Sequence, residues 1–129
     1  MAIVGTGVDL AEVSRMQAAL EDPRTGARFR TRVFTEGEQR YCEGRGVGRY
    51  QSYAARFAAK EATMKALGTG HTRGVLWRDI EVFRHGGPPQ LRLSGGALRH
   101  FEAMRARRSL LTITHAEALA MAQVLLLSE

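Results

Sequence analysis

The chain has 129 residues and a formal net charge of +6 at pH 7. A chain of this length forms one domain around one core, so we expect residues 1–129 to be a single domain. No stretch approaches the roughly 18 apolar residues of a membrane-spanning helix, and the first residues lack the basic flank and long apolar region of a signal peptide. These features exclude a membrane-spanning protein and predict a cytoplasmic one with no membrane partner.

The positive charge predicts a polyanionic partner, such as nucleic acid, a phosphorylated ligand or an acidic protein. A small RNA-binding module would fit the charge, but the sequence has no aromatic RNA-recognition signature, zinc-ligand set or Gly-x-x-Gly clamp. We therefore expect no nucleic-acid partner. The single cysteine, Cys42, has no motif around it and is interpreted as a core residue.

The N-terminal segment predicts a strand followed by a helix. Residues 2–8 are apolar and contain glycines that allow close backbone approach. Asp9 ends this strand, and a helix follows over about residues 10–20. Asp9 and Glu12 fit the N-cap and N3 positions of a capping box. The end of a strand is also where an aspartate points into a cleft, so a cap and a metal ligand are both open interpretations.

The next segment is strongly basic. Residues 21–34 contain a proline, a glycine and four arginines, which predicts a solvated basic loop or helix edge. Thr35 and Glu38 form a capping box that opens a second short helix. Three glycines then end this helix: Gly44, Gly46 and Gly48.

The longest predicted helix extends from Tyr50 or Tyr53 to Leu67. It is rich in alanine, contains no proline or internal glycine, and is followed by Gly68 at a helix-ending position.

The charged residues of this helix fall into two groups on a helical wheel. A polar face carries Arg56, Lys60 and Thr63. Glu61 and Lys65 instead fall inside the apolar arc that should face the core. They have the spacing of an ordinary exposed ion pair. Alternatively the helix borders a site, because a carboxylate beside apolar surface needs a cationic partner, which is Lys65 or a divalent metal.

The C-terminal half of the sequence predicts two pairs of strands with a helix between them. Residues 79–85 and 90–94 form a hairpin across the turn at 86–89, and an amphipathic helix covers about 95–107. Residues 110–114 and 119–127 are strands, the last one apolar enough to be central. The predicted fold is α+β: a small antiparallel sheet packed with one long and several short helices.

His115 follows the strand at 110–114, and catalytic groups often project from strand ends. A lone histidine at such a place also fits a structural role, so both interpretations are open.

Taken together, the sequence resembles the holo-acyl-carrier-protein synthase type of 4'-phosphopantetheinyl transferase. The resemblance lies in residues 3–15, in residues 32–38, in the C-terminal strand pair around 112–115 and, most specifically, in residues 55–70. These blocks are in the family's order and cover nearly the whole chain. The family pattern Ser-x-Ser-His-acid departs here to Thr112-Ile-Thr114-His115-Ala116.

The resemblance implies the reaction and its metal. The 4'-phosphopantetheine arm of coenzyme A moves to a serine of apo acyl carrier protein, and adenosine 3',5'-bisphosphate is released. The family's metal-binding acids match Asp9 and Glu61. Mg²⁺ suits this pair because it takes one or two carboxylates together with substrate phosphate.

The remaining predicted site residues follow from the chemistry of this transfer and from family position. We expect Lys65 to stabilise charge on the phosphoryl group, and either Glu61, through a metal-bound water, or His115 to accept the serine proton. The predicted contacts to coenzyme A are Lys65, Gly68, Thr69, Gly70, Thr114 and His115.

The resemblance also implies two kinds of protein partner. The acidic acyl carrier protein docks on a basic surface in which Arg15 has the matching position, with Arg24 and Arg28 as helpers. The family assembles as a homotrimer with sites between subunits, so we expect this chain to do so.

Overall fold

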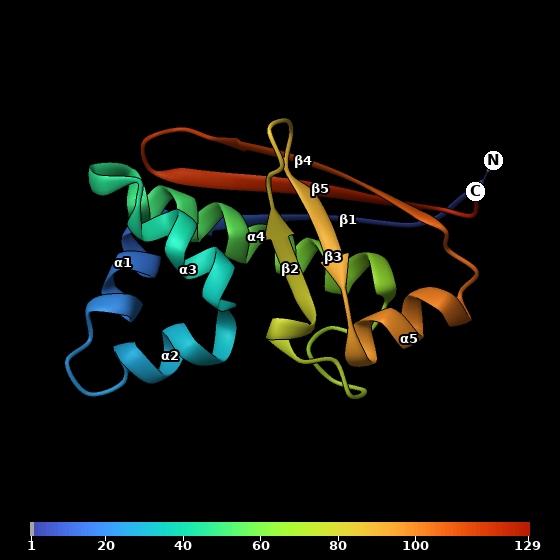
Figure 1. Ribbon diagram of the computed structural model, residues 1–129, viewed down its shortest axis with the longest axis horizontal. Coiled ribbons are helices and arrows are strands. Elements are labelled where there is room, and N and C mark those ends of the chain that lie inside the picture. The colour runs from blue at the N-terminus through green and yellow to red at the C-terminus, as the bar shows by residue number, and fades with distance from the viewer. Residues whose placement is uncertain (1) are drawn as a thin grey trace.

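The largest sheet joins the two ends of the chain (Figure 1). The computed structural model describes residues 2–129. β1 (Ile3–Glu12), β5 (Leu119–Leu127) and β4 (Arg108–His115) pair antiparallel in the order β1-β5-β4. β5 is central, as its apolar sequence predicts, and every second residue from Ala120 to Leu126 is buried. The order leaves β1 and β4 as the two edges of the sheet.

α4 (Arg49–Leu67) covers one face of this sheet, as Figure 1 shows. Its bounds confirm the predicted long helix, and Gly68 ends it in the left-handed conformation with φ of 78°. A Cβ atom at Gly7 of β1 would lie 1.9 Å from the carbonyl oxygen of Ala62. Only glycine therefore lets the β1 backbone lie directly against α4.

Shorter elements pack around the rest of α4 (Figure 1). On one side lie three helices: α1 (Val13–Glu21), α2 (Gly26–Val33) and α3 (Glu36–Glu43), with the 3-10 turn η1 (Gly46–Gly48) leading into α4. On the other lie a two-stranded antiparallel sheet, a 3-10 turn and a helix: β2 (Ile80–Phe83), β3 (Gln90–Leu93), η2 (Trp77–Asp79) and α5 (Gly95–Ala103). The predicted α+β class is confirmed, with two small sheets.

The end of β1 differs from its prediction. The strand continues to Glu12, and α1 begins only at Val13. Asp9 is paired opposite Ala122 in the ladder, so the interpretation of Asp9 as a helix cap is wrong. Glu12 holds the N-cap position without a side-chain cap. The reason is tertiary, because pairing with β5 holds residues 9–12 extended and satisfies those of their backbone groups that face β5.

The rotation of α4 also differs from its prediction. Arg56, Lys60 and Thr63 are 4%, 0% and 0% exposed, although the wheel placed them on a solvated face. They lie on the side covered by α3 and the β2–β3 hairpin, which the sequence of α4 alone does not reveal. Lys65, expected in the apolar arc, has a side chain that is 56% exposed.

Smaller differences concern ends of elements. Residues 26–33 of the basic segment form the regular helix α2, and α5 ends at Ala103, earlier than expected. The capping box of Thr35 and Glu38 is confirmed. Among residues 2–129, no helix has both the length and the apolar character to cross a bilayer.

Candidate functional site

The predicted site residues Asp9 and Lys65 meet where β1 crosses α4. Lys65 Nζ lies 2.8 Å from Asp9 Oδ1 and donates a second hydrogen bond to the carbonyl oxygen of Val8, at 3.2 Å. The close contact at Gly7 brings these two elements together. The hydrogen bond to Asp9, and then its charge, raises the pKa of Lys65, so the side chain stays cationic at neutral pH.

Glu61 lies one turn before Lys65 on α4 and is half-buried. Burial raises the pKa of Glu61, and the negative charge of Asp9 raises it further, while Lys65 and His71 oppose the shift. Glu61 lines a cavity of about 520 Å³ that is bordered by the end of β1, by α1 and by Phe57. The two predicted acids therefore influence each other electrostatically, and one of them, Glu61, lines the cavity.

This donor set fits Mg²⁺. Within residues 2–129, no group of three or more histidine, cysteine or acidic side chains surrounds a common point. Two carboxylates, with the remaining positions left to water and substrate phosphate, are the usual protein ligands of this ion. The pKa of Glu61, raised in part by Asp9, indicates that a cation between the two would relieve an unfavourable pairing of like charges.

His115 and Thr114 lie at the end of β4. The turn that follows His115 contacts the beginning of α4, where the side-chain nitrogen of Gln51 lies 3.5 Å from the carbonyl oxygen of Ala116. Gln51 precedes Glu61 by about 15 Å along the helix at the standard rise. In the sheet, His115 pairs with Ala120, which pairs with Ala11 of β1, so two strand spacings, roughly 10 Å, separate His115 from the end of β1.

The loop of Gly68, Thr69 and Gly70 follows directly after Lys65, but most of its polar groups are already paired. The backbone N–H groups of Gly68 and Thr69 donate to the carbonyl oxygens of Lys65 and Met64. The Thr69 hydroxyl is bonded to the carbonyl oxygen of Gly70, and the residue is buried. Gly68 and Gly70 are exposed, and the contacts of this loop with coenzyme A stay a prediction.

The three predicted docking arginines lie on the side of α1 and α2. Arg15 is highly exposed, makes a loose ion pair of 3.6 Å with Glu12 and borders the same cavity as Glu61. Arg24 and Arg28 are exposed, and Arg28 lines a neighbouring hollow. A basic rim therefore adjoins the cavity of Glu61.

A basic pocket was missed by the sequence analysis. It has a volume of about 350 Å³, and the basic residues that line it are Arg40, Arg56, Arg84, His85 and Arg92. Its one acidic lining residue, Glu81, forms an ion pair of 3.1 Å with Arg92. Arg56 stacks on the ring of Tyr41 at 4.1 Å, and its buried Nε has no hydrogen-bond partner. The pocket lies across α4 from Glu61. The sequence carried only the arginines as a signal, because the burial of Arg56 depends on α3 and the β2–β3 hairpin.

Comparisons with known proteins identify this combination of fold and site. The family model described as the 4'-phosphopantetheinyl transferase superfamily matches residues 5–121. The chain belongs to this superfamily. The holo-[acyl-carrier-protein] synthase of Solibacter usitatus is 51% identical over 125 residues, which cover 96% of this chain and 98% of that protein. The protein of the same name from Brucella ovis is 52% identical over 79% of this chain and 75% of its own length.

Solved structures of this superfamily have the same fold. The holo-[acyl-carrier-protein] synthase of Neisseria meningitidis matches with a TM-score of 0.83 and 27% identity, over 97% of this chain and 98% of that one. The synthase of Bacillus anthracis, in a complex with CoA (3',5'-ADP), matches with a TM-score of 0.79 and 36% identity, over 98% of each chain. The prediction of a phosphopantetheinyl transferase of the holo-acyl-carrier-protein synthase type is confirmed.

Proposed function

We propose that this chain is a Mg²⁺-dependent holo-acyl-carrier-protein synthase. It transfers the 4'-phosphopantetheine arm of coenzyme A to a serine of apo acyl carrier protein. The serine oxygen forms a bond to the phosphorus that carries the arm, the bond from that phosphorus to the leaving adenosine 3',5'-bisphosphate breaks, and the serine proton passes to a base. The observation that carries the proposal is the contact of Asp9 with Lys65 and the electrostatic coupling of both to Glu61, which lines a cavity, in a member of this superfamily.

Each of these three side chains has one role in the proposal. Asp9 and Glu61 would hold Mg²⁺, which supplies stabilisation of the negative charge on the diphosphate. Lys65 places a second positive charge beside the phosphoryl oxygens. Glu61 is one proposed acceptor of the serine proton, through a water bound to the metal. His115 of a neighbouring subunit would be the alternative acceptor.

A homotrimer with sites between subunits would supply such a neighbour. The face of the large sheet opposite α4 is open, and its neighbouring strands carry large apolar side chains that are 41–58% exposed: Val8, Leu10, Leu110, Leu119 and Met121. A patch of this kind marks a protein interface. Thr114 belongs to the same face, opposite Met121.

The basic pocket of Arg56 would then hold phosphate of a coenzyme A that reaches in from the site of the adjacent subunit. Its buried, unpartnered guanidinium nitrogen supports an anionic ligand. The synthase of Bacillus anthracis, solved in a complex with CoA (3',5'-ADP), supports the same choice of ligand. The rim of Arg15, Arg24 and Arg28 would receive the acidic carrier protein, and the cytoplasm is the proposed compartment.

The test is a transfer assay with purified components. Apo acyl carrier protein, coenzyme A and Mg²⁺ are incubated with the protein, and the carrier is weighed by mass spectrometry. The carrier should gain the mass of one phosphopantetheinyl group, and EDTA should prevent the gain until Mg²⁺ is restored in excess. An unchanged carrier mass with both fatty-acid and polyketide carriers would contradict the proposal.

A further inference from the structure

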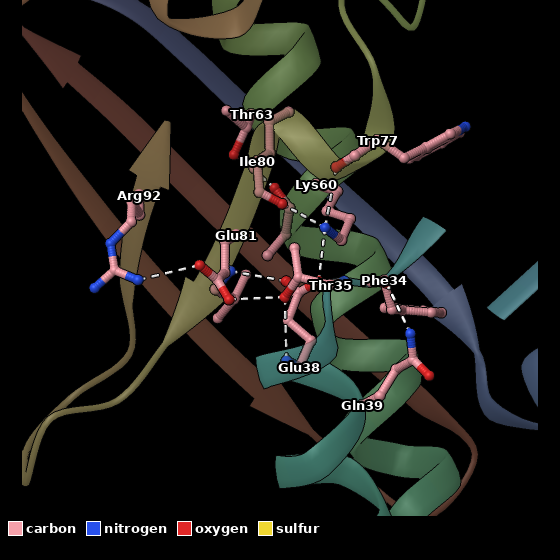
Figure 2. Close-up of polar contacts among 12 residues, drawn as sticks. Phe34, Thr35, Glu38, Gln39, Lys60, Thr63, Trp77, Ile80, Glu81 and Arg92 are labelled. Atoms are coloured by element: carbon pink, nitrogen blue, oxygen red, sulfur yellow. Dashed lines mark hydrogen bonds and ion pairs between the residues drawn. The ribbon is translucent and has the colours of Figure 1, made fainter. Parts of the chain in front are cut away.

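Lys60 is a fully buried cation that precedes the site residue Glu61 in the sequence. None of the proposed roles in metal binding or phosphoryl transfer involves it. Its side chain is 0% exposed, and its three ammonium hydrogens meet three acceptors, as Figure 2 shows. Nζ lies 2.9 Å from Glu38 Oε1 and 3.0 Å from the carbonyl oxygen of Trp77, and it also donates to the carbonyl oxygen of Ile80. Every hydrogen-bonding capacity of the ammonium group is therefore used.

The acceptors come from different elements, which Lys60 ties to α4. Glu38 belongs to α3, where its Oε1 also accepts from the backbone N–H of Thr35 at 2.9 Å. Its Oε2 accepts from the backbone N–H of Val82 in β2 at 2.8 Å. The pair thus joins α4, the N-terminus of α3 and the start of β2 through directional bonds (Figure 2).

Stability alone does not account for this pair. Removing two charges from water costs several kcal/mol per ion, and an apolar pair of similar volume is often as stable. Six buried alanines make up much of the contact surface of α4, and their small side chains set the rotation of the helix about its axis only weakly: Ala54, Ala55, Ala58, Ala59, Ala62 and Ala66. The larger buried side chains of Tyr53, Arg56, Met64 and Leu67 add to this contact, and Lys60 contributes directional bonds to three acceptors.

The pair is also connected to the walls of the Glu61 cavity. The Trp77 residue whose carbonyl accepts from Lys60 stacks its ring on Phe57, with ring centroids 5.1 Å apart and planes 20° apart. Phe57 lines the cavity together with Glu61. The ring of His71 also stacks on the ring of Trp77, with the ring centroids 5.5 Å apart. A rotation of α4 would disturb this stack and the direction of Glu61 together.

We propose that Lys60 is a positioning residue: its buried bonds to Glu38, Trp77 and Ile80 fix the rotation of α4, and with it the direction in which Glu61 presents its carboxylate to the metal. The inference rests on the proposed function, because it assigns Glu61 to Mg²⁺. Lys60 itself touches neither the metal nor the substrate.

The main variant removes both charges at once, so that no ion is left buried alone. Lys60→Met combined with Glu38→Gln keeps the side-chain volumes. Metal affinity is measured with Mn²⁺ in place of Mg²⁺, by the electron paramagnetic resonance signal of the free ion, with saturating coenzyme A. We expect a native circular dichroism spectrum, a Mn²⁺ affinity at least fivefold weaker and a lower kcat, with an unchanged KM for carrier protein because the arginine rim is intact.

A matched control separates positioning from general loosening. Tyr53→Phe, on the same helix, removes a buried hydrogen bond of 2.7 Å to Glu43 without touching the Lys60 pair. It should lower the melting temperature and leave Mn²⁺ affinity unchanged. Equal losses of Mn²⁺ affinity in the two variants would overturn the proposal, and so would wild-type affinity in the double variant.

Two further outcomes are distinguishable. If the double variant does not fold, Lys60→Met alone decides, because it removes all three bonds of Lys60 while Glu38 keeps its bonds to the backbone N–H groups of Thr35 and Val82. A weaker Mn²⁺ affinity in this single variant supports positioning, and an unchanged one overturns it. A wild-type protein that binds no Mn²⁺ and transfers nothing would overturn the proposed function as well, whereas a wild-type protein active beside an equally active double variant overturns positioning alone.

Discussion

At the scale of single residues, the site brings like charges together. Asp9 and Glu61 are both acids beside one cavity, and the pKa of Glu61 is raised by burial and by Asp9. Lys65 offsets part of the repulsion between the two carboxylates through its contact with Asp9. Glu61 itself receives no hydrogen bond from any side chain of residues 2–129. Such an arrangement is unfavourable in the metal-free protein and favourable once a divalent cation is bound.

Glu61→Gln should therefore separate activity from stability. A raised folded-state pKa means that ionised Glu61 weakens the fold at pH values above its unfolded pKa, so the neutral amide removes this penalty. We expect loss of transfer, a metal-free melting temperature equal to or above that of the wild type at pH 7.5, and no further rise with Mg²⁺. Calorimetry with and without the metal measures this. A clear drop in the metal-free melting temperature would contradict it.

Proton competition gives a second test of the same carboxyl. Because its pKa is raised, protons should begin to displace Mg²⁺ from Glu61 at a higher pH than they do from an ordinary glutamate. Mg²⁺ affinity, followed by calorimetry from pH 8 downward, should weaken progressively as the pH falls. In Glu61→Gln this component should be absent. An equal pH dependence in the wild type and the variant would count against Glu61 as the ligand that titrates.

Cys42 illustrates a residue for which the sequence interpretation fits the structure. It is fully buried, and burial raises the pKa of its thiol to about 12. Because the thiolate is the nucleophile, we expect no alkylation by iodoacetamide at pH 8 in the native protein and complete alkylation in denaturant. Mass spectrometry of the intact chain measures both. Rapid alkylation of the native protein would show that Cys42 is accessible.

At the scale of elements, local sequence predicted the bounds of helices and strands better than their surroundings. The alanine-rich run and Gly68 were enough to define α4, and the apolar run at 119–127 was enough to place β5 in the centre. The buried face of α4 was not predictable, because the partners of Lys60 come from Glu38, Trp77 and Ile80, far away in the chain. Asp9 was ambiguous for the same reason: its neighbours fit a helix cap, and only pairing with β5 decides for the strand.

The contact of β1 with α4 can be tested at Gly7. A methyl group there would lie 1.9 Å from the Ala62 carbonyl oxygen, so β1 must move away from α4 and carry Asp9 with it. We expect Gly7→Ala to cost at least about 1–3 kcal/mol of unfolding free energy in urea, as overpacked sites do. It should also weaken Mg²⁺ binding. Gly87→Ala is the control, because a Cβ atom there meets no atom within 4 Å. Equal stability of the two variants would contradict the close packing.

At the scale of the whole molecule, the basic rim and the apolar sheet face adjoin each other at the Glu61 cavity. The arginine rim borders this cavity on the side of α1 and α2, and Leu10 lines it from β1 while belonging, with Val8 and Met121, to the open face of the large sheet. The first surface suits an acidic partner that binds transiently, and the second suits a second copy of the chain. The trimer and the docking direction stay proposals that solution experiments decide.

Reversing one rim charge should weaken encounter with the carrier protein. Arg15→Glu should raise KM for apo carrier protein several-fold with kcat little changed, and the difference should shrink as salt is added, because rim charges act mainly on the association rate. Arg99→Glu makes the same charge change on exposed α5 and is the control. Equal KM values for the two variants would remove Arg15 from the docking surface.

The central claim is that Asp9 and Glu61 coordinate one divalent ion beside the diphosphate of coenzyme A. A crystal grown with coenzyme A and Mn²⁺ tests it most directly, through the anomalous signal of the metal. We expect one strong peak within about 2.0–2.4 Å of carboxylate oxygens of both residues and of a coenzyme A phosphate oxygen, the usual range for hard cations. A fully bound coenzyme A with no peak between these two acids, or with the metal held elsewhere, would contradict the claim.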